Sequence, residues 1–171
     1  MIPELIYFDA AVVVTGMLYG AIWNANVMMF SLFLGICLLS RYPKVAVVDS
    51  FIVIDLVDFF TLYTYATLGT VYGMAMLVLG CWLPQAYSVG ESPMDTIDRM
   101  VSLFFALGVF AIALKLGVTM LMAITIGIFV SMMLWALVAV FIFHVPDPRF
   151  ILMAVAKPVL FNRVLAIIGC C

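Results

Sequence analysis

The sequence consists of long uncharged apolar runs separated by short polar segments. The first run, residues 10–40, contains no charged residue over 31 positions, and residues 59–82 are also uncharged. Residues 100–143 contain a single charge, at Lys115. About 20 apolar residues in a helix suffice to cross the hydrocarbon of a bilayer. The pattern therefore predicts four membrane spans, at about 10–39, 50–82, 95–116 and 119–143.

The polar segments contain residues that end and begin helices. Segment 40–44, SRYPK, combines two basic residues with a proline that interrupts a helix. In segment 84–99, Ser92 is suited to cap a helix and Pro93 to occupy its first position. A tight turn is predicted at KLGVT, where Gly117 ends a helix.

The C-terminal segment, residues 149–171, is apolar but is interrupted by Lys157, Pro158 and Arg163. We therefore expect this tail to lie in the membrane interface instead of spanning the bilayer. Neither an internal repeat nor a low-complexity linker divides the sequence. The whole chain, residues 1–171, is predicted to form a single integral membrane domain.

The composition supports a membrane location. Of the 171 residues, 68% are hydrophobic and 9% are charged, with a mean hydropathy of +1.35. Soluble chains are about 45–50% apolar and about 25% charged, and a soluble fold of this size cannot bury so much apolar surface. We predict an all-α, polytopic transmembrane helical bundle with the lipid bilayer as its partner. The net charge of −2 and the lack of a basic run argue against nucleic-acid binding.

The basic residues give conflicting evidence on orientation. Arg41 and Lys44 in the first loop and Lys115 in the third favour an N-terminus outside, because cytoplasmic loops are enriched in Lys and Arg. Four spans then place the basic tail outside as well, against the same rule. Either a partner or anionic lipid neutralises the tail, or the number of spans differs from four by one.

Asp55 and Asp58 form the candidate ion site. Residues three apart share a face of a helix, and an ionisable residue inside a membrane suggests function by default. The alternative is that residues 59–82 span the bilayer alone, which leaves both carboxylates hydrated beside the headgroups. We expect this alternative, because the second segment is nearly twice as long as a bilayer requires.

Small residues recur four positions apart in three of the predicted spans. They are Gly16, Gly20, Gly69, Gly73, Ala123, Gly127 and Ser131. Helices in lipid associate through close backbone contact and dispersion, so these residues predict a tightly packed bundle or an oligomer. Asn24 and Asn26, near the middle of the first predicted span, are expected to hydrogen-bond across helices. The alternative is that they line a pore.

The sequence offers little for catalysis or for cofactor binding. His144 is the only histidine, and the four cysteines lack metal-ligand spacing. Nucleotide-binding and hydrolase motifs do not occur. We therefore expect no enzymatic activity and no cofactor. The predicted function is assembly in the membrane with itself or with other membrane subunits, as a homo-oligomeric pore-type protein or as a structural subunit of a larger complex. The alternative is an ion- or proton-coupled channel or transporter that uses Asp55 and Asp58.

Overall fold

The computed structural model describes residues 3–46, 56–85, 93–141, 156–157 and 159. All regular structure in this part of the chain is helical, which confirms the predicted all-α class. The helices are α1 (Pro3–Trp23), α2 (Ala25–Ala46), α3 (Val57–Leu68), α4 (Thr70–Gln85), α5 (Pro93–Lys115) and α6 (Met120–Phe141). The chain divides into two compact units, Met1–Thr96 and Ile97–Cys171.

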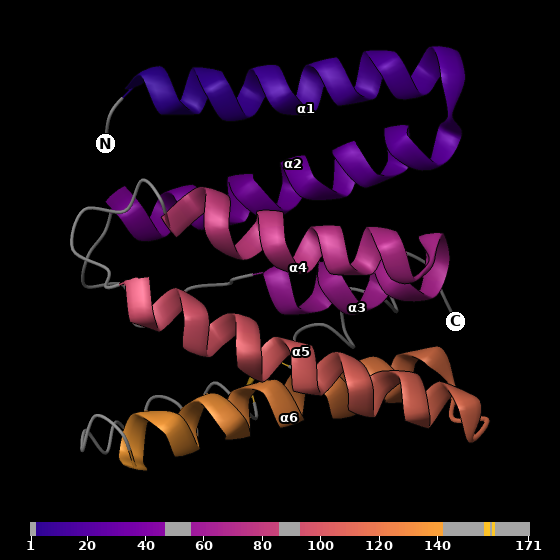
Figure 1. The fold of residues 1–171 in the computed structure, drawn as a ribbon, viewed down its shortest axis with the longest axis vertical. Helices are drawn as coiled ribbons and strands as arrows, with labels where there is room; N and C mark the ends of the chain where they lie inside the picture. The colour runs from indigo at the N-terminus through magenta and orange to yellow at the C-terminus, as the bar shows by residue number, and fades with distance from the viewer. Residues whose placement is uncertain (1–2, 47–55, 86–92, 142–155, 158, 160–171) are drawn as a thin grey trace. The chain divides into compact units, whose positions relative to one another are not determined.

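Helices α1 and α2 form an antiparallel hairpin (Figure 1). The expectation of one helix over 10–39 is wrong, because the chain reverses at Asn24. The side-chain Oδ1 of Asn24 accepts a hydrogen bond of 2.9 Å from the backbone N–H of Asn26, so Asn24 caps the start of α2. Both asparagines are exposed at this turn. The expectation that they bond across helices in the middle of a span is therefore wrong too.

Helices α3 and α4 form a second hairpin, which turns at Gly69. Gly69 has φ 99° and ψ 176°, a backbone conformation that is essentially confined to glycine. Its N–H donates to the carbonyl of Tyr65 at 3.2 Å and so closes α3. The expected span over 50–82 is therefore divided into two helices. Thr67, Gly69 and Thr70 are exposed around the turn.

Aromatic contacts join α2 to both helices of the second hairpin. The ring of Phe33 stacks on Phe60 with centroids 5.5 Å apart and meets the edge of Tyr63 at 5.4 Å. Phe30 and Tyr72 lie 5.7 Å apart. Such pairs contribute about 0.5–1.5 kcal/mol each beyond the area that they bury.

The last of these contacts places both turns at one end of the first unit. Phe30 follows the turn at Asn24, and Tyr72 follows the turn at Gly69. Since their rings are in contact, the starts of α2 and α4 lie together. Figure 1 shows the two turns on the same side of this unit.

Helices α5 and α6 form the hairpin of the second unit. The N–H of Gly117 donates to the carbonyl of Leu114, and the N–H of Val118 donates to that of Ala113, both at 3.1 Å. With Gly117 at φ 80°, this pattern is a Schellman motif, as the KLGVT segment predicts. Both helices end close to the ranges expected from the sequence.

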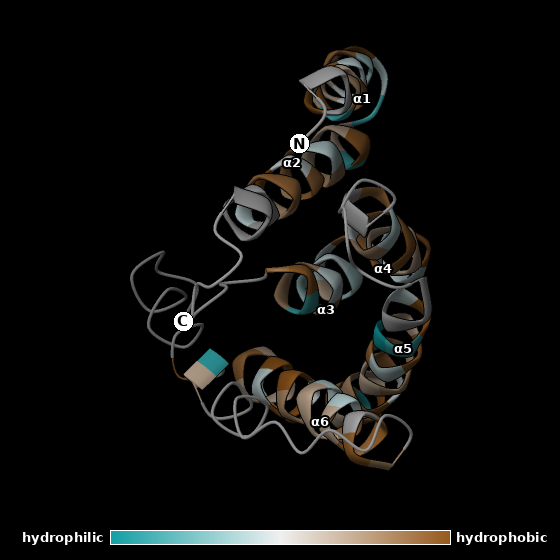
Figure 2. Ribbon diagram, turned by 90° about the vertical axis from the view of Figure 1, so that its left-hand side faces the viewer, coloured by the Kyte–Doolittle hydropathy of each residue, from teal (hydrophilic) through white to brown (hydrophobic). Residues whose placement is uncertain are grey.

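Three helical segments are long and apolar enough to cross a membrane: Ile6–Trp23, Thr96–Lys115 and Met120–Val138. Ala25–Ser40 and Thr70–Leu83 are shorter apolar helices. Figure 2 shows apolar residues over most of α4 and α6. By length and composition, the chain is consistent with a multi-pass membrane protein. The first two of the four expected spans are replaced by hairpins.

Candidate functional site

Asp58 lies in the first turn of α3 and is 0% exposed. The expectation that it sits at a helix end is met, but the expectation that its carboxylate is hydrated is wrong. The turn at Gly69 folds α4 back beside α3, and Val57, next to Asp58, lies beside Gly80 of α4. Asp55 lies outside the described residues.

Asp58 begins a series of four polar residues on α3. The others are Thr61, Thr64 and Thr67, each three positions after the last. Side chains three apart are neighbours on a helix surface, with Cβ atoms about 5–6 Å apart. Asp58, Thr61 and Thr64 are completely buried, whereas Thr67 is exposed beside the turn at Gly69. The series therefore leads from the interior of the protein to its surface.

The hydroxyl groups of this series differ in their hydrogen bonds. Thr67 donates to the carbonyl of Tyr63 at 2.8 Å, and Thr125 on α6 donates likewise to Leu121 at 2.9 Å. Within the part of the chain that the structure describes, the hydroxyl oxygens of Thr61 and Thr64 have no hydrogen-bond partner. A buried polar group without a partner costs about 1–3 kcal/mol, so these two hydroxyls require an explanation.

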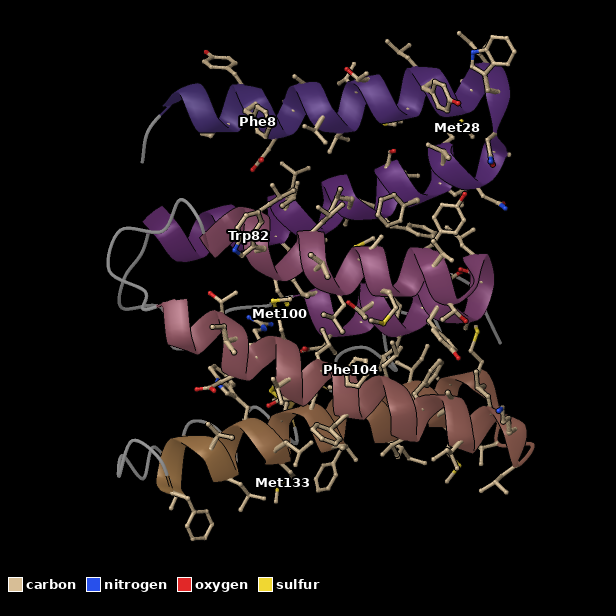
Figure 3. The ribbon with its side chains drawn as sticks, in the orientation of Figure 1. Phe8, Met28, Trp82, Met100, Phe104 and Met133 are labelled. Atoms are coloured by element: carbon tan, nitrogen blue, oxygen red, sulfur yellow. The ribbon has the colours of Figure 1, made fainter. Side chains whose placement is uncertain are left out.

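The small residues of the first unit make their close contacts within the chain. A Cβ on Gly16 would collide with the hydroxyl of Ser31, and one on Gly20 with the backbone nitrogen of Met28. Figure 3 places Met28 beside the turn from α1 to α2. A Cβ on Gly73 would lie 2.6 Å from Cβ of Tyr65. These glycines thus allow α1 to approach α2, and α4 to approach α3.

The remaining predicted packing residues differ in their burial and in their neighbours. Gly69 forms the turn and has no neighbour that an added Cβ would meet. Ala123, Gly127 and Ser131 are all buried on α6. Small residues at these positions are compatible with packing inside the second unit.

Arg99 on α5 lies within the predicted span 95–116, but the sequence analysis did not single it out. It is 6% exposed, and its guanidinium carbon lies 6.0 Å from the ring centroid of Trp135 on α6. A cation–π contact of this kind contributes about 0.5–2 kcal/mol. Thr96 and Ser102, three positions away on either side, are also buried. The three-residue spacing of Thr96, Arg99 and Ser102 was the sequence feature from which a buried polar face of α5 could have been predicted.

The described residues were also compared with the donor sets that metal ions require. The described residues contain no group of three or more His, Cys, Asp or Glu side chains that could hold a metal ion. His144 and nearly all of the tail over 149–171 lie outside the described residues. Lys157, which belongs to that tail, is buried. No protein-family model, curated protein or solved structure matches the chain.

Proposed function

We propose that this protein moves a proton or a small cation across a membrane and that the carboxylate of Asp58 holds the transported species. The complete burial of Asp58 supports this proposal most directly. A carboxylate inside an apolar bundle is expensive, and such residues in membrane proteins commonly mark ion and proton pathways. The geometry thus favours the transport alternative over the assembly role that the sequence suggested first.

The depth of Asp58 supports the same proposal. A turn in a lipid-exposed hairpin has to reach water or headgroups, because its backbone groups need hydrogen-bond partners. Asp58 precedes Gly69 by 11 residues, or about 16 Å of helix. The hydrocarbon is about 30 Å thick, so Asp58 would lie near the middle of the bilayer.

The shortness of α3 also fits a transport site. Its 12 residues extend about 18 Å, which is too short to cross the hydrocarbon. Transporters commonly place ion sites near the bilayer midplane where hydrophobic segments are short or interrupted by glycine. Here Gly69 interrupts the segment, and α3 carries the buried carboxylate.

Asp58→Asn tests the proposal in liposomes that contain the purified protein. Proton flux is followed with an enclosed pH-sensitive dye and sodium flux with a radioactive tracer. We expect whichever flux the parent supports to fall at least about tenfold, a change of about 1.4 kcal/mol in barrier height. The control is Asp98→Asn on α5, a residue that is half-buried overall although its Oδ2 is buried, whereas Asp58 is completely buried. Unchanged flux in a correctly folded Asp58→Asn protein would refute the proposal.

A second candidate function, assembly with further copies or other subunits, is favoured by the surface of α1. Only 11% of the Ile6–Trp23 segment is buried, compared with 39% and 33% of the segments in α5 and α6. Large apolar residues, including Phe8 (Figure 3), cover its exposed sides. The mass of the protein in mild detergent separates this role from that of a monomeric transporter.

A further inference from the structure

The hydroxyl groups of Thr61 and Thr64 present a problem that packing alone does not solve. Both threonines are 0% exposed, and neither hydroxyl has a partner in the described part of the chain. Thr67 and Thr125 show that a helical threonine can bond to the carbonyl four residues earlier. Thr61 and Thr64 do not use this option, so their hydroxyls remain available to a small polar ligand.

We propose that Thr61 and Thr64 hold a file of water molecules that conducts protons between Asp58 and the exposed turn at Thr67–Thr70. This inference rests on the proposed transport function and narrows the transported species to the proton. Buried polar groups that lack protein partners are commonly satisfied by internal water. The file follows the three-residue spacing of the polar series along α3.

The spacing of the series fits one bridging water at each step. Neighbouring Cβ atoms in a three-residue step lie about 5–6 Å apart. One water between two side-chain oxygens, with two hydrogen bonds of about 2.8 Å, covers the same distance. One water thus joins Asp58 to Thr61 and another joins Thr61 to Thr64. The carboxylate has about four acceptor sites, so it can bind this water beside its other interactions.

The proposed transfer conserves protons at every oxygen. A proton leaves the carboxyl of Asp58 and forms a new O–H bond with the first water, and that water releases one of its own protons to the Thr61 hydroxyl. Thr61 in turn passes its original proton to the next water, and Thr64 repeats the step toward the turn. Asp58 is left as a carboxylate and is protonated again by the next proton to enter.

A file of water molecules accounts for the two buried hydroxyls without protein partners better than bound metal ions do. Thr61 and Thr64 each offer a single neutral oxygen. Hard metal ions such as Ca²⁺ require about six to eight oxygen ligands, mostly from carboxylates and carbonyls. The described residues contain no cluster of acidic side chains that could supply them. Water needs only two to four polar partners.

The test compares two double variants of the complete protein in liposomes with a pH-sensitive dye. Thr61→Val with Thr64→Val keeps the shape of both side chains and removes both hydroxyls, whereas Thr61→Ser with Thr64→Ser keeps the hydroxyls. We expect proton flux to fall at least about tenfold in the Val variant, or about 1.4 kcal/mol in barrier height. The Ser variant should retain most of the parental flux. Thr125→Val, whose hydroxyl is already bonded within its own helix, is the control.

Water contact is measured independently by solid-state NMR on protein with isotope-labelled threonine in bilayers. Magnetisation from water should reach Thr61 and Thr64 sooner than Thr125, although Thr61 and Thr64 are fully buried and Thr125 is only partly buried. Slow transfer to Thr61 and Thr64, or full proton flux in the Val variant, would overturn the water file. Loss of flux in Asp58→Asn together with either of these results would leave the transport proposal intact. Unchanged flux in both Asp58→Asn and the Val variant would refute both.

Discussion

Gly69 shows how a single residue decides the course of the chain. With φ 99° and ψ 176°, it occupies a backbone region that a residue with a Cβ adopts only at a cost of about 1–3 kcal/mol. The turn it forms sends α4 back along α3. That return brings Gly80 of α4 beside Val57, the residue before Asp58. One glycine therefore sets which part of α4 lies beside the start of α3, 11 residues before Gly69.

We predict that Gly69→Ala lowers the free energy of unfolding by about 1–3 kcal/mol. The reason is backbone strain alone, since an added Cβ meets no neighbour there. Gly108→Ala is the matched control. It also adds a Cβ in open space but lies inside α5, where alanine should stabilise the helix by about 0.5–1 kcal/mol. Thermal melting in detergent compares the two. Equal melting temperatures would contradict the role given to the turn.

Only part of the site could be predicted at this scale. The three-residue spacing of Asp55 and Asp58 follows from the sequence and suggested an ion site, whereas their position just before residues 59–82 suggested hydrated carboxylates. The burial of Asp58 could not be predicted from hydropathy. A hydropathy average depends only on residues that are adjacent in sequence, whereas burial also depends on the helix that packs against Asp58 in the folded chain. Thr61 and Thr64 were overlooked because threonine is unremarkable in an apolar run. Their importance depends on hydrogen bonds that only the folded chain reveals.

The hairpin is the unit from which the described part of the chain is built. Each pair, α1–α2, α3–α4 and α5–α6, reverses at one or a few residues. The sequence predicted the third reversal correctly, since Lys115 and Gly117 interrupt that apolar run. The first two were missed because the uncharged runs 10–40 and 59–82 are equally consistent with one long helix or with two shorter antiparallel ones. An exposed asparagine cap and a glycine are weak signals within such a run.

Gly20 should be the most sensitive position in the first hairpin. A Cβ there would collide with the backbone of Met28, which cannot move without shifting α2. At Gly35 it would meet only the end of the Val13 side chain, at 2.9 Å. We predict that Gly20→Ala destabilises the protein by about 1–3 kcal/mol and that Gly35→Ala has a smaller effect. Unfolding in a denaturing detergent measures both. A larger loss at Gly35 would show that the close approach lies elsewhere.

For the whole molecule, the arrangement inside the first unit makes a prediction about its sides. The turns at Asn24 and Gly69 lie at one end of this unit, and the ends of α2 and α4 lie at the other. If the unit crosses a membrane, we predict that the two turns lie on one side of it and that the segments after α2 and α4 lie on the other.

Single cysteines in a background without native cysteines test this arrangement with an impermeant thiol reagent. Cysteines at Tyr42 and Ser92 should react from one side of the membrane. Those at Asn24 and Thr70, which are exposed at the two turns of the first unit, should react from the other. A chain with the four spans expected from the sequence would instead place Tyr42 and Ser92 on opposite sides. The labelling pattern therefore decides between the two topologies.

The asparagine-capped turn also has a consequence for biosynthesis. If α1 and α2 enter the membrane together, the only part of the first 46 residues that has to pass through the bilayer is the short segment around Asn24, which carries no formal charge. Glu4, at the start of α1, and Arg41 and Lys44, at the end of α2, all lie at the end of the hairpin opposite this turn, so they would stay in the compartment in which they were synthesised. The ribosome-bound chain would thus be anchored by a pair of helices whose insertion requires no charged group to cross the hydrocarbon.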